Sequence, residues 1–144
     1  MKILVIKGCY TLIAELNSPI FIPIGKRGIQ SFKAGYYAYV GSALHGLEHR
    51  IGRHLRKEKR LHWHIDYLLQ YAEICGVICA ETGSKQECRI AEGLQKILES
   101  VPGFGCSDCR CFSHLFFSND PAALKQAVLT GFKSAGLTPD EYDY

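Results

Sequence analysis

The sequence contains no long hydrophobic run. No stretch approaches the roughly 18 apolar residues that a membrane-spanning helix requires, so we expect no membrane span. Low-complexity tracts, internal repeats and linker-like segments are also missing, which predicts a single domain over residues 1–144. The apolar start is interrupted by Lys7 and no small-residue cleavage site follows, so a secretory leader is not predicted.

Cysteine occurs in an odd number, seven, in a chain for which no export signal is predicted. We therefore expect reduced thiols rather than a disulfide framework, and a cytoplasmic protein. Hydrophobic residues make up 47% of the chain, which is enough to build a core without a disulfide or a structural metal.

Positive charge is only slightly in excess, at +3, but it is unevenly distributed. The segment HGLEHRIGRHLRKEKRLHWH, residues 45–64, combines clustered Lys and Arg with five of the six histidines. A helix this basic offers a positive surface to phosphate groups, which favours DNA, or less readily RNA, as a partner. The alternative is a solvated charged helix without a partner.

The periodicity of apolar residues predicts an α/β (α+β) fold. Alternating and β-branched residues predict an antiparallel meander at 10–16, 20–24 and 29–40, with a turn at 25–28, and later strands at 74–80 and 112–118. Helices are expected at 46–57, at 64–72, over about 17 residues from Ser84, and from Asp120 as N-cap to Gly136. Together these elements predict a small mixed, largely antiparallel sheet with helices packed on it.

Five short motifs follow one another along the chain. GCY at 8–10 and YVG at 39–41 lie on predicted strands, and Leu47-x-x-Arg50-x-x-x-His54 lies on the first predicted helix. HWHIDYLL at 62–69 and SDCRCFSHL at 107–115 come later. The ordered set resembles the GIY-YIG nuclease superfamily. Within it, the chain resembles a prokaryotic group that also occurs fused to endonuclease III-like repair proteins.

The sequence departs from the pattern of that superfamily in three places. Cys9 and Val40 each stand where an isoleucine is usual, and both are conservative changes for a strand. The interval between the two tripeptides is long, which implies an insertion of two strands at 17–35.

The resemblance implies a metal-dependent endonuclease acting on DNA, with a role in repair. The alternative is a catalytically inactive nucleic-acid-binding or interaction module of the same fold.

The resemblance also implies which residues would act on a phosphodiester. Tyr10 would assist the deprotonation of water, and Tyr39 would position the phosphate or Tyr10. Arg50 would be the phosphate-facing arginine, supported by His54. Glu87, on a later helix, matches a metal-binding glutamate, which implies Mg²⁺ or Mn²⁺ as the cofactor.

Helix geometry agrees with a site on one side of the first helix. At 100° per residue, Arg50 lies about 60° and His54 about 20° to the same side of Leu47, so both flank the apolar stripe. Arg53 lies farther round and is expected to face solvent or a nucleic-acid backbone. The other candidates for nucleic-acid binding are Arg56, Lys57, His62 and His64.

Glu87 has two interpretations. With Ser84 it forms the Ser-x-x-Glu pattern of a capping box, in which its carboxylate would accept from the Ser84 amide. It also shares the apolar stripe of Ile90 and Leu94, where an unpaired carboxylate is costly. One carboxylate with water ligands suits Mg²⁺, so a metal ligand is the second interpretation.

Two further clusters contain metal-ligand side chains. Cys106, Cys109, Cys111 and His114 have the spacing of a zinc site, but a strand in this region would separate them onto two faces. We therefore favour buried thiols in a tight loop over Zn²⁺. The segment His62–Asp66 is open to three interpretations: a partial metal site, a nucleic-acid contact beside Trp63, or a cap for the second helix.

Overall fold

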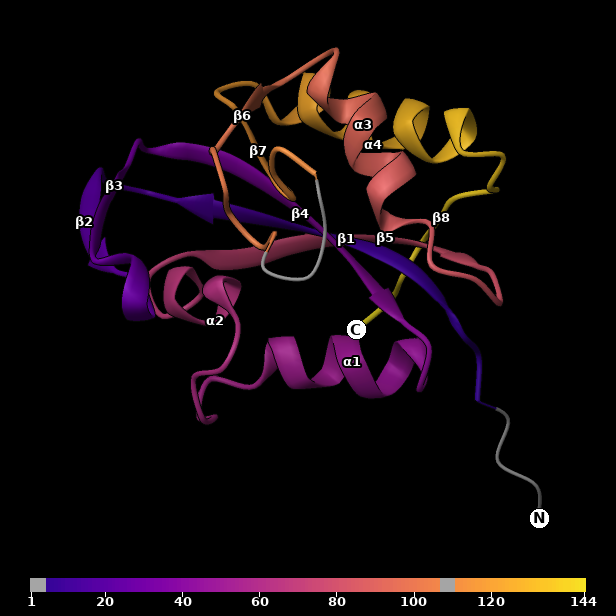
Figure 1. The fold of residues 1–144 in the computed structure, drawn as a ribbon, viewed down its shortest axis with the longest axis horizontal. Helices are drawn as coiled ribbons and strands as arrows, with labels where there is room; N and C mark the ends of the chain where they lie inside the picture. Colours follow the sequence, from indigo (N-terminus) through magenta and orange to yellow (C-terminus); the bar gives the residue numbers. More distant parts are fainter. Residues whose placement is uncertain (1–4, 107–110) are drawn as a thin grey trace.

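The computed structural model describes residues 5–106 and 111–144 (Figure 1). Within these ranges a six-stranded sheet carries helices on both faces, with α1 (Leu47–Leu55) and α2 (His64–Leu68) on one face. The opposite face carries α3 (Glu87–Gln95) and α4 (Pro121–Ser134). The α+β class predicted from the sequence is thus confirmed. No helix in the described ranges is both long enough and apolar enough to cross a membrane.

The sheet is built around one central strand. Its order is β6-β7-β4-β1-β5-β8, and each pairing between described strands is antiparallel. β1 pairs with β4 along its whole length on one side, and with β5 from Gly8 to Glu15 on the other. The strands are β1 (Gly8–Leu16), β4 (Gly35–Ala43), β5 (Glu73–Glu81), β6 (Glu99–Ser100), β7 (Leu115–Ser118) and β8 (Asp140–Glu141).

Side-chain alternation along the strands creates two separate cores. Tyr10 and Leu12 of β1 belong to the core under α1 and α2, whereas Cys9 and Ile13 belong to the core under α3 and α4. Neighbouring residues of one strand therefore serve opposite faces, as a pleated strand requires. Because the central strands are covered on both sides, they contain few polar side chains.

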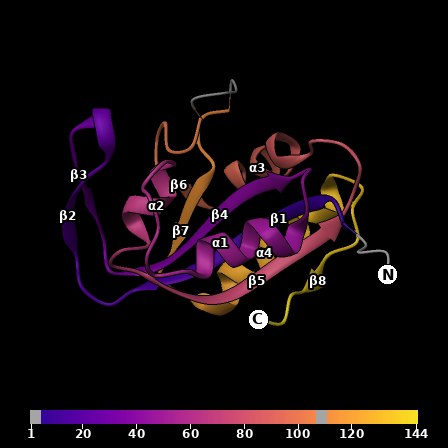
Figure 2. The same cartoon turned by 90° about the horizontal axis from the view of Figure 1, so that it is seen from below.

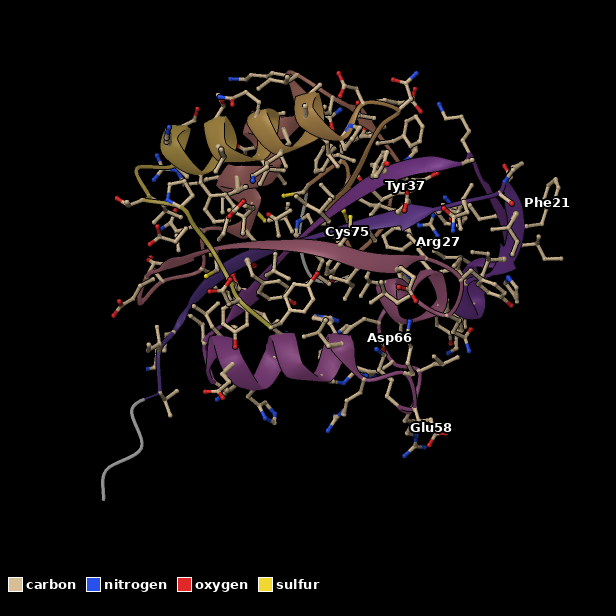
Figure 3. All side chains as sticks on the ribbon, turned by 180° about the vertical axis from the view of Figure 1, so that it is seen from behind. Phe21, Arg27, Tyr37, Glu58, Asp66 and Cys75 are labelled. Atoms are coloured by element: carbon tan, nitrogen blue, oxygen red, sulfur yellow. The ribbon has the colours of Figure 1, made fainter. Side chains whose placement is uncertain are left out.

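A hairpin extends from one end of the molecule. β2 (Ile20–Pro23) and β3 (Ile29–Phe32) form a separate two-stranded sheet around a short 3₁₀ turn, Gly25–Arg27 (Figure 2). This is the insertion expected at 17–35, and it corrects the prediction of one unbroken strand over 29–40. Arg27 holds the turn by donating to the carbonyls of Gly103 and Pro102, at 2.7 and 2.9 Å. Figure 3 shows Phe21 of this hairpin pointing away from the molecule.

The two long helices on the second face begin differently. α4 begins as predicted, because the Asp120 side chain accepts from the Ala122 amide at 3.0 Å. α3 is shorter than predicted, with Gln86 as its N-cap and Glu87 as its first residue. The predicted capping box is wrong: the Ser84 amide contacts Thr82 Oγ1 at 3.4 Å, and the Glu87 carboxylate accepts from another strand.

The outer edge of β4 is only partly covered. β7 pairs with β4 between Tyr36 and Tyr39 and then diverges, and the Val40 amide still donates to the His114 carbonyl at 3.0 Å. Beyond that point, at Gly41 and Ser42, no described strand pairs with this side of β4. Side chains from both faces of the sheet can therefore meet at the open edge.

We predict that the two candidate caps differ in their contribution to stability. Asp120→Ala removes a side-chain cap and should lower the free energy of unfolding by about 1 kcal/mol. Ser84→Ala removes no helix cap and should change it by less than about 0.5 kcal/mol. Urea denaturation of both variants measures the difference, and equal losses would show that Ser84 does cap α3.

Candidate functional site at the open edge of the sheet

A cavity of about 600 Å³ lies at the open edge of β4. Residues from β1, β4, α1 and the start of α2 line it on one side, and the start of α3 lines it on the other. Seven of the candidate residues from the sequence are among those that line it: Tyr10, Tyr39, Arg50, His62, His64, Glu87 and His114. Tyr10 and Glu87, which are 77 positions apart in the chain, are thus brought to one place.

Tyr10 and Tyr39 lie on the same face of the sheet. Tyr10 pairs with Gly41, and Tyr39 is two residues from Gly41, so all three face the core under α1. A Cβ at position 41 would lie 2.5 Å from the Tyr10 hydroxyl oxygen. Glycine is therefore required at the end of the YVG motif because the Tyr10 side chain occupies the space that any other residue would fill.

His54 lies behind Tyr10 rather than in the cavity. It is 3% exposed, and its Nε2 is 2.7 Å from the Tyr10 hydroxyl. Burial lowers the pKa of His54 to about 3, and nearby Lys59 adds to this effect although Asp66 opposes it. The ring is neutral at physiological pH, so His54 supports Tyr10 and does not itself face a ligand in the cavity.

Both tyrosines are neutral at physiological pH. Burial raises the pKa of Tyr10 far above its ordinary value, and the neighbouring Tyr39 adds to the increase. The charge of Arg50 and a hydrogen bond with it act in the opposite direction. Burial also raises the pKa of Tyr39, again opposed by Arg50. Arg50, with a smaller contribution from Arg53 at Tyr10, therefore favours a phenolate at this site.

Arg50 is held in the cavity by contacts on two sides. Its Nη1 donates to the Ser42 carbonyl at 3.3 Å, and its guanidinium carbon lies 4.6 Å from the centre of the Trp63 ring. A guanidinium has five N–H donors and binds oxyanions in a bidentate manner. An arginine fixed in this way loses little further side-chain freedom when it binds an anion.

Glu87 reaches the cavity from the opposite face of the sheet. Its Oε2 accepts a hydrogen bond from the Ser42 hydroxyl. Ser42 therefore contacts Arg50 through its backbone and Glu87 through its side chain. Nothing in the sequence indicated this role for Ser42, because Ser42 connects the two residues only when β4, α1 and α3 have assembled.

Arg53 does not face solvent as expected, which corrects that prediction. Its guanidinium forms two hydrogen bonds of 2.9 Å with the fully buried carboxylate of Asp66, and it stacks on Trp63 at 4.3 Å. Asp66 also accepts from the amides of His62 and Trp63, at 2.8 and 2.9 Å. Burial alone would raise the pKa of Asp66, but these hydrogen bonds outweigh it and lower the pKa.

The segment His62–Asp66 therefore has a positioning role. Asp66 caps the start of α2 and anchors Arg53, and both Arg53 and Arg50 lie against the Trp63 ring. Figure 3 shows Asp66 on the side of the sheet that α1 and α2 cover. His64 Nδ1 accepts from the Gly105 amide at 3.0 Å, whereas His62 is exposed at the cavity. Of the interpretations drawn from the sequence, capping is confirmed.

The two remaining basic candidates lie outside the cavity. Arg56 and Lys57 are exposed beside a smaller hollow that His54 also lines. Lys57 forms an ion pair of 3.0 Å with Glu73, and both side chains are largely exposed. Such a pair adds little stability, so Lys57 can exchange it for another anion.

The predicted zinc residues are only partly assembled. Cys109 lies outside the described residues, and Cys106 donates to the Phe104 carbonyl at 3.4 Å. Instead, Cys111 and His114 lie with Cys88, a residue that the sequence did not single out, and their ligand atoms all fall within 4.8 Å of one another. The sequence could not indicate Cys88, because α3 and the segment with Cys111 and His114 come together only in the tertiary structure.

The fold and the site together define an α+β domain with a cavity of basic, acidic and aromatic side chains at the open edge of its sheet. A family model described as a domain of unknown function, DUF123, matches residues 9–137, and the chain belongs to this family. The match includes every residue that lines the cavity. No curated protein and no solved structure matches the chain.

We predict that His54 makes the stability of the fold depend on pH. Between pH 6.5 and about 3 the unfolded chain binds a proton at His54 that the folded chain does not, so the free energy of unfolding falls as the pH falls. One such proton corresponds to roughly 1.4 kcal/mol per pH unit in that window. Urea denaturation of His54→Gln between pH 7 and 4 should show a slope reduced by about this amount.

Exposed His49 on the same helix supplies the matched control. His49→Gln should leave the pH dependence of the wild-type protein unchanged. If His54→Gln shows the wild-type slope, then folding does not lower the pKa of His54, and the ring is protonated in the folded protein below about pH 6.5.

Proposed function

We propose that the protein is a metal-dependent phosphodiesterase that binds DNA, or less readily RNA, at the edge cavity and hydrolyses its backbone. The observation that carries this proposal is the convergence of Tyr10, Tyr39, Arg50 and Glu87 on one cavity. Core packing does not require these four to meet, because they come from two strands and from helices on opposite faces. Groups that act on a single phosphate do have to surround one accessible point.

The charges around the cavity suit a phosphate and a cation together. Arg50 and Lys85 line it with positive charge, and Glu87 lines it with negative charge. A hydrolytic site needs cationic groups for the phosphate oxygens and a centre that activates water. Arg50 and Glu87 each form a hydrogen bond with Ser42. This arrangement leaves the charge of Arg50 for the phosphate and the charge of Glu87 for the cation.

Glu87 fits the residue that would hold a divalent cation. Mg²⁺ is commonly held by one or two carboxylates, with water and substrate phosphate as its other ligands. The half-buried Glu87 carboxylate lies at the cavity wall, and the Ser42 hydroxyl orients it. When bound, Mg²⁺ or Mn²⁺ would neutralise charge on the phosphate and make a bound water more acidic.

The chain's own residues would orient the reactants. His54 Nδ1 is buried without a hydrogen-bond partner among the described residues. An unpaired buried N–H is costly, so the proton of this neutral ring belongs on Nε2, which then donates to Tyr10. Tyr10 is left to donate its own proton into the cavity, toward a phosphate oxygen or the attacking water. Arg50 would bind the phosphate, and its charge opposes the rise in the pKa of Tyr10 that burial causes.

One observation favours a second candidate function, a binding module without catalysis. Tyr10 is only 1% exposed, and burial raises its pKa far above the physiological range. A tyrosine that remains neutral can bind phosphate but cannot accept a proton from water. Arg50 and the other basic residues would then hold nucleic acid at the edge cavity without cutting it.

We predict cleavage that depends on Glu87 and a divalent cation. Purified protein is incubated at low salt with labelled linear, nicked and branched DNA and with RNA, in Mg²⁺, Mn²⁺ or chelator. The wild-type protein should cut only with the cation, and Glu87→Gln should reduce the rate by about a hundredfold or more because it loses the ligand charge. Glu92→Gln, an exposed change on the same helix, should have no effect.

Binding measured in parallel separates the two candidate functions. Affinity should fall steeply with salt, because phosphate contacts release counterions. Binding without cleavage in either cation would establish the binding module. A protein that binds no nucleic acid even at low salt would contradict both.

We predict that Tyr10→Phe retains DNA binding but loses most cleavage, by about 10²–10⁴-fold if the hydroxyl takes part in proton transfer. The change leaves the buried His54 ring without its partner, so the free energy of unfolding should fall by about 1–3 kcal/mol. The matched control is Tyr37→Phe, which loses a hydrogen bond of 2.7 Å to the Lys33 carbonyl outside the cavity. Equal cleavage by the two variants would remove Tyr10 from the mechanism.

A further inference from the structure

Three metal-ligand side chains from separate parts of the chain meet beside the edge cavity. Cys88 lies in the first turn of α3, and Cys111 and His114 lie in the segment that leads into β7. The Cys88 Sγ and His114 Nε2 atoms are 3.8 Å apart, and these two atoms and the Cys111 Sγ all lie within 4.8 Å of one another. Core packing alone gives no reason for two thiols and an imidazole to point at one spot.

We propose that Cys88, Cys111 and His114 bind a zinc ion. Thiolate and imidazole are the ligands that zinc prefers, at about 2.3 Å for sulfur and 2.0–2.1 Å for nitrogen. In a tetrahedral site these bond lengths separate the ligand atoms by about 3.5–3.8 Å. The pair formed by Cys88 and His114 already has this spacing, and the third ligand atom needs to approach by only about 1 Å.

The surroundings of two of the ligands favour metal binding. Cys88 is the second residue of a nine-residue helix, where the helix dipole stabilises a thiolate. The His114 ring is buried and forms a hydrogen bond with the backbone of Val40. Histidines that bind metal usually donate their second ring N–H in this way, which fixes the ring orientation.

The proposed zinc ligands differ from the set that sequence spacing suggested, for which we favoured buried thiols over Zn²⁺. The two sets share Cys111 and His114, but Cys88 from α3 takes part in place of the candidates Cys106 and Cys109. The ion would connect α3 to the segment before β7 across the open edge of the sheet. Because Cys88 directly follows Glu87 and lines the same cavity, zinc would also hold the acidic wall of that cavity in place.

The zinc content of the full-length protein tests this inference. Protein purified without chelator should contain about one equivalent of zinc by elemental analysis. Cys88→Ser, Cys111→Ser and His114→Asn should each lose most of it. Cys75→Ser and Cys79→Ser, changes at cysteines of β5, should keep it. Removal of the metal should lower the melting temperature of the wild-type protein but not that of Cys88→Ser.

A second measurement covers variants that fold poorly. Metal-free wild-type protein titrated with Co²⁺ should develop the visible and near-ultraviolet bands of tetrahedral thiolate ligation, and Zn²⁺ should abolish them. Wild-type protein that contains no zinc and binds neither ion would overturn the inference. Full zinc in Cys88→Ser together with its loss in Cys106→Ser would also overturn it, in favour of the loop set. None of these results depends on whether the protein cleaves DNA.

Discussion

The pairing of Tyr10 with Gly41 on adjacent strands is the constraint on which the site depends. Without a side chain at position 41, the Tyr10 ring crosses the neighbouring strand and brings its hydroxyl to the open edge of the sheet. The Tyr10 hydroxyl contacts the buried His54 ring, and it also forms a hydrogen bond with Arg50. A single added methyl group would displace the tyrosine from this position, so the motif is a steric requirement as well as a chemical one.

The buried ion pair between Arg53 and Asp66 supports the arginine and the tryptophan beside this site. Asp66 is removed from water, which is costly unless its oxygens are satisfied, and they accept from Arg53 and from two backbone amides. Arg53 is thereby fixed against one contact surface of Trp63, and Arg50 contacts the same ring. Asp66 thus supports the position of Arg50 through Arg53 and Trp63, although Asp66 itself does not line the cavity.

The open edge of β4 explains how two kinds of ligand chemistry occur in one place. The face under α1 contributes phenols and a guanidinium, which suit phosphate. The face under α3 contributes a carboxylate, which suits a hard cation, and then thiols and an imidazole, which suit a softer one. In a fully paired sheet a neighbouring strand would separate these faces. Because β7 pairs with β4 only as far as Tyr39, side chains from the two faces meet at the open edge.

The sequence by itself determined the fold class, the central strands and the identity of several residues around the cavity, because periodicity and local motifs are local properties. It also predicted the cap at Asp120 and the inserted hairpin. Tertiary structure alone decided that Glu87 contacts Ser42 rather than capping α3, that Arg53 pairs with Asp66, and that Cys88 joins Cys111 and His114. Each of these contacts spans 13 or more positions, and side-chain direction at that range depends on how helices pack on the sheet.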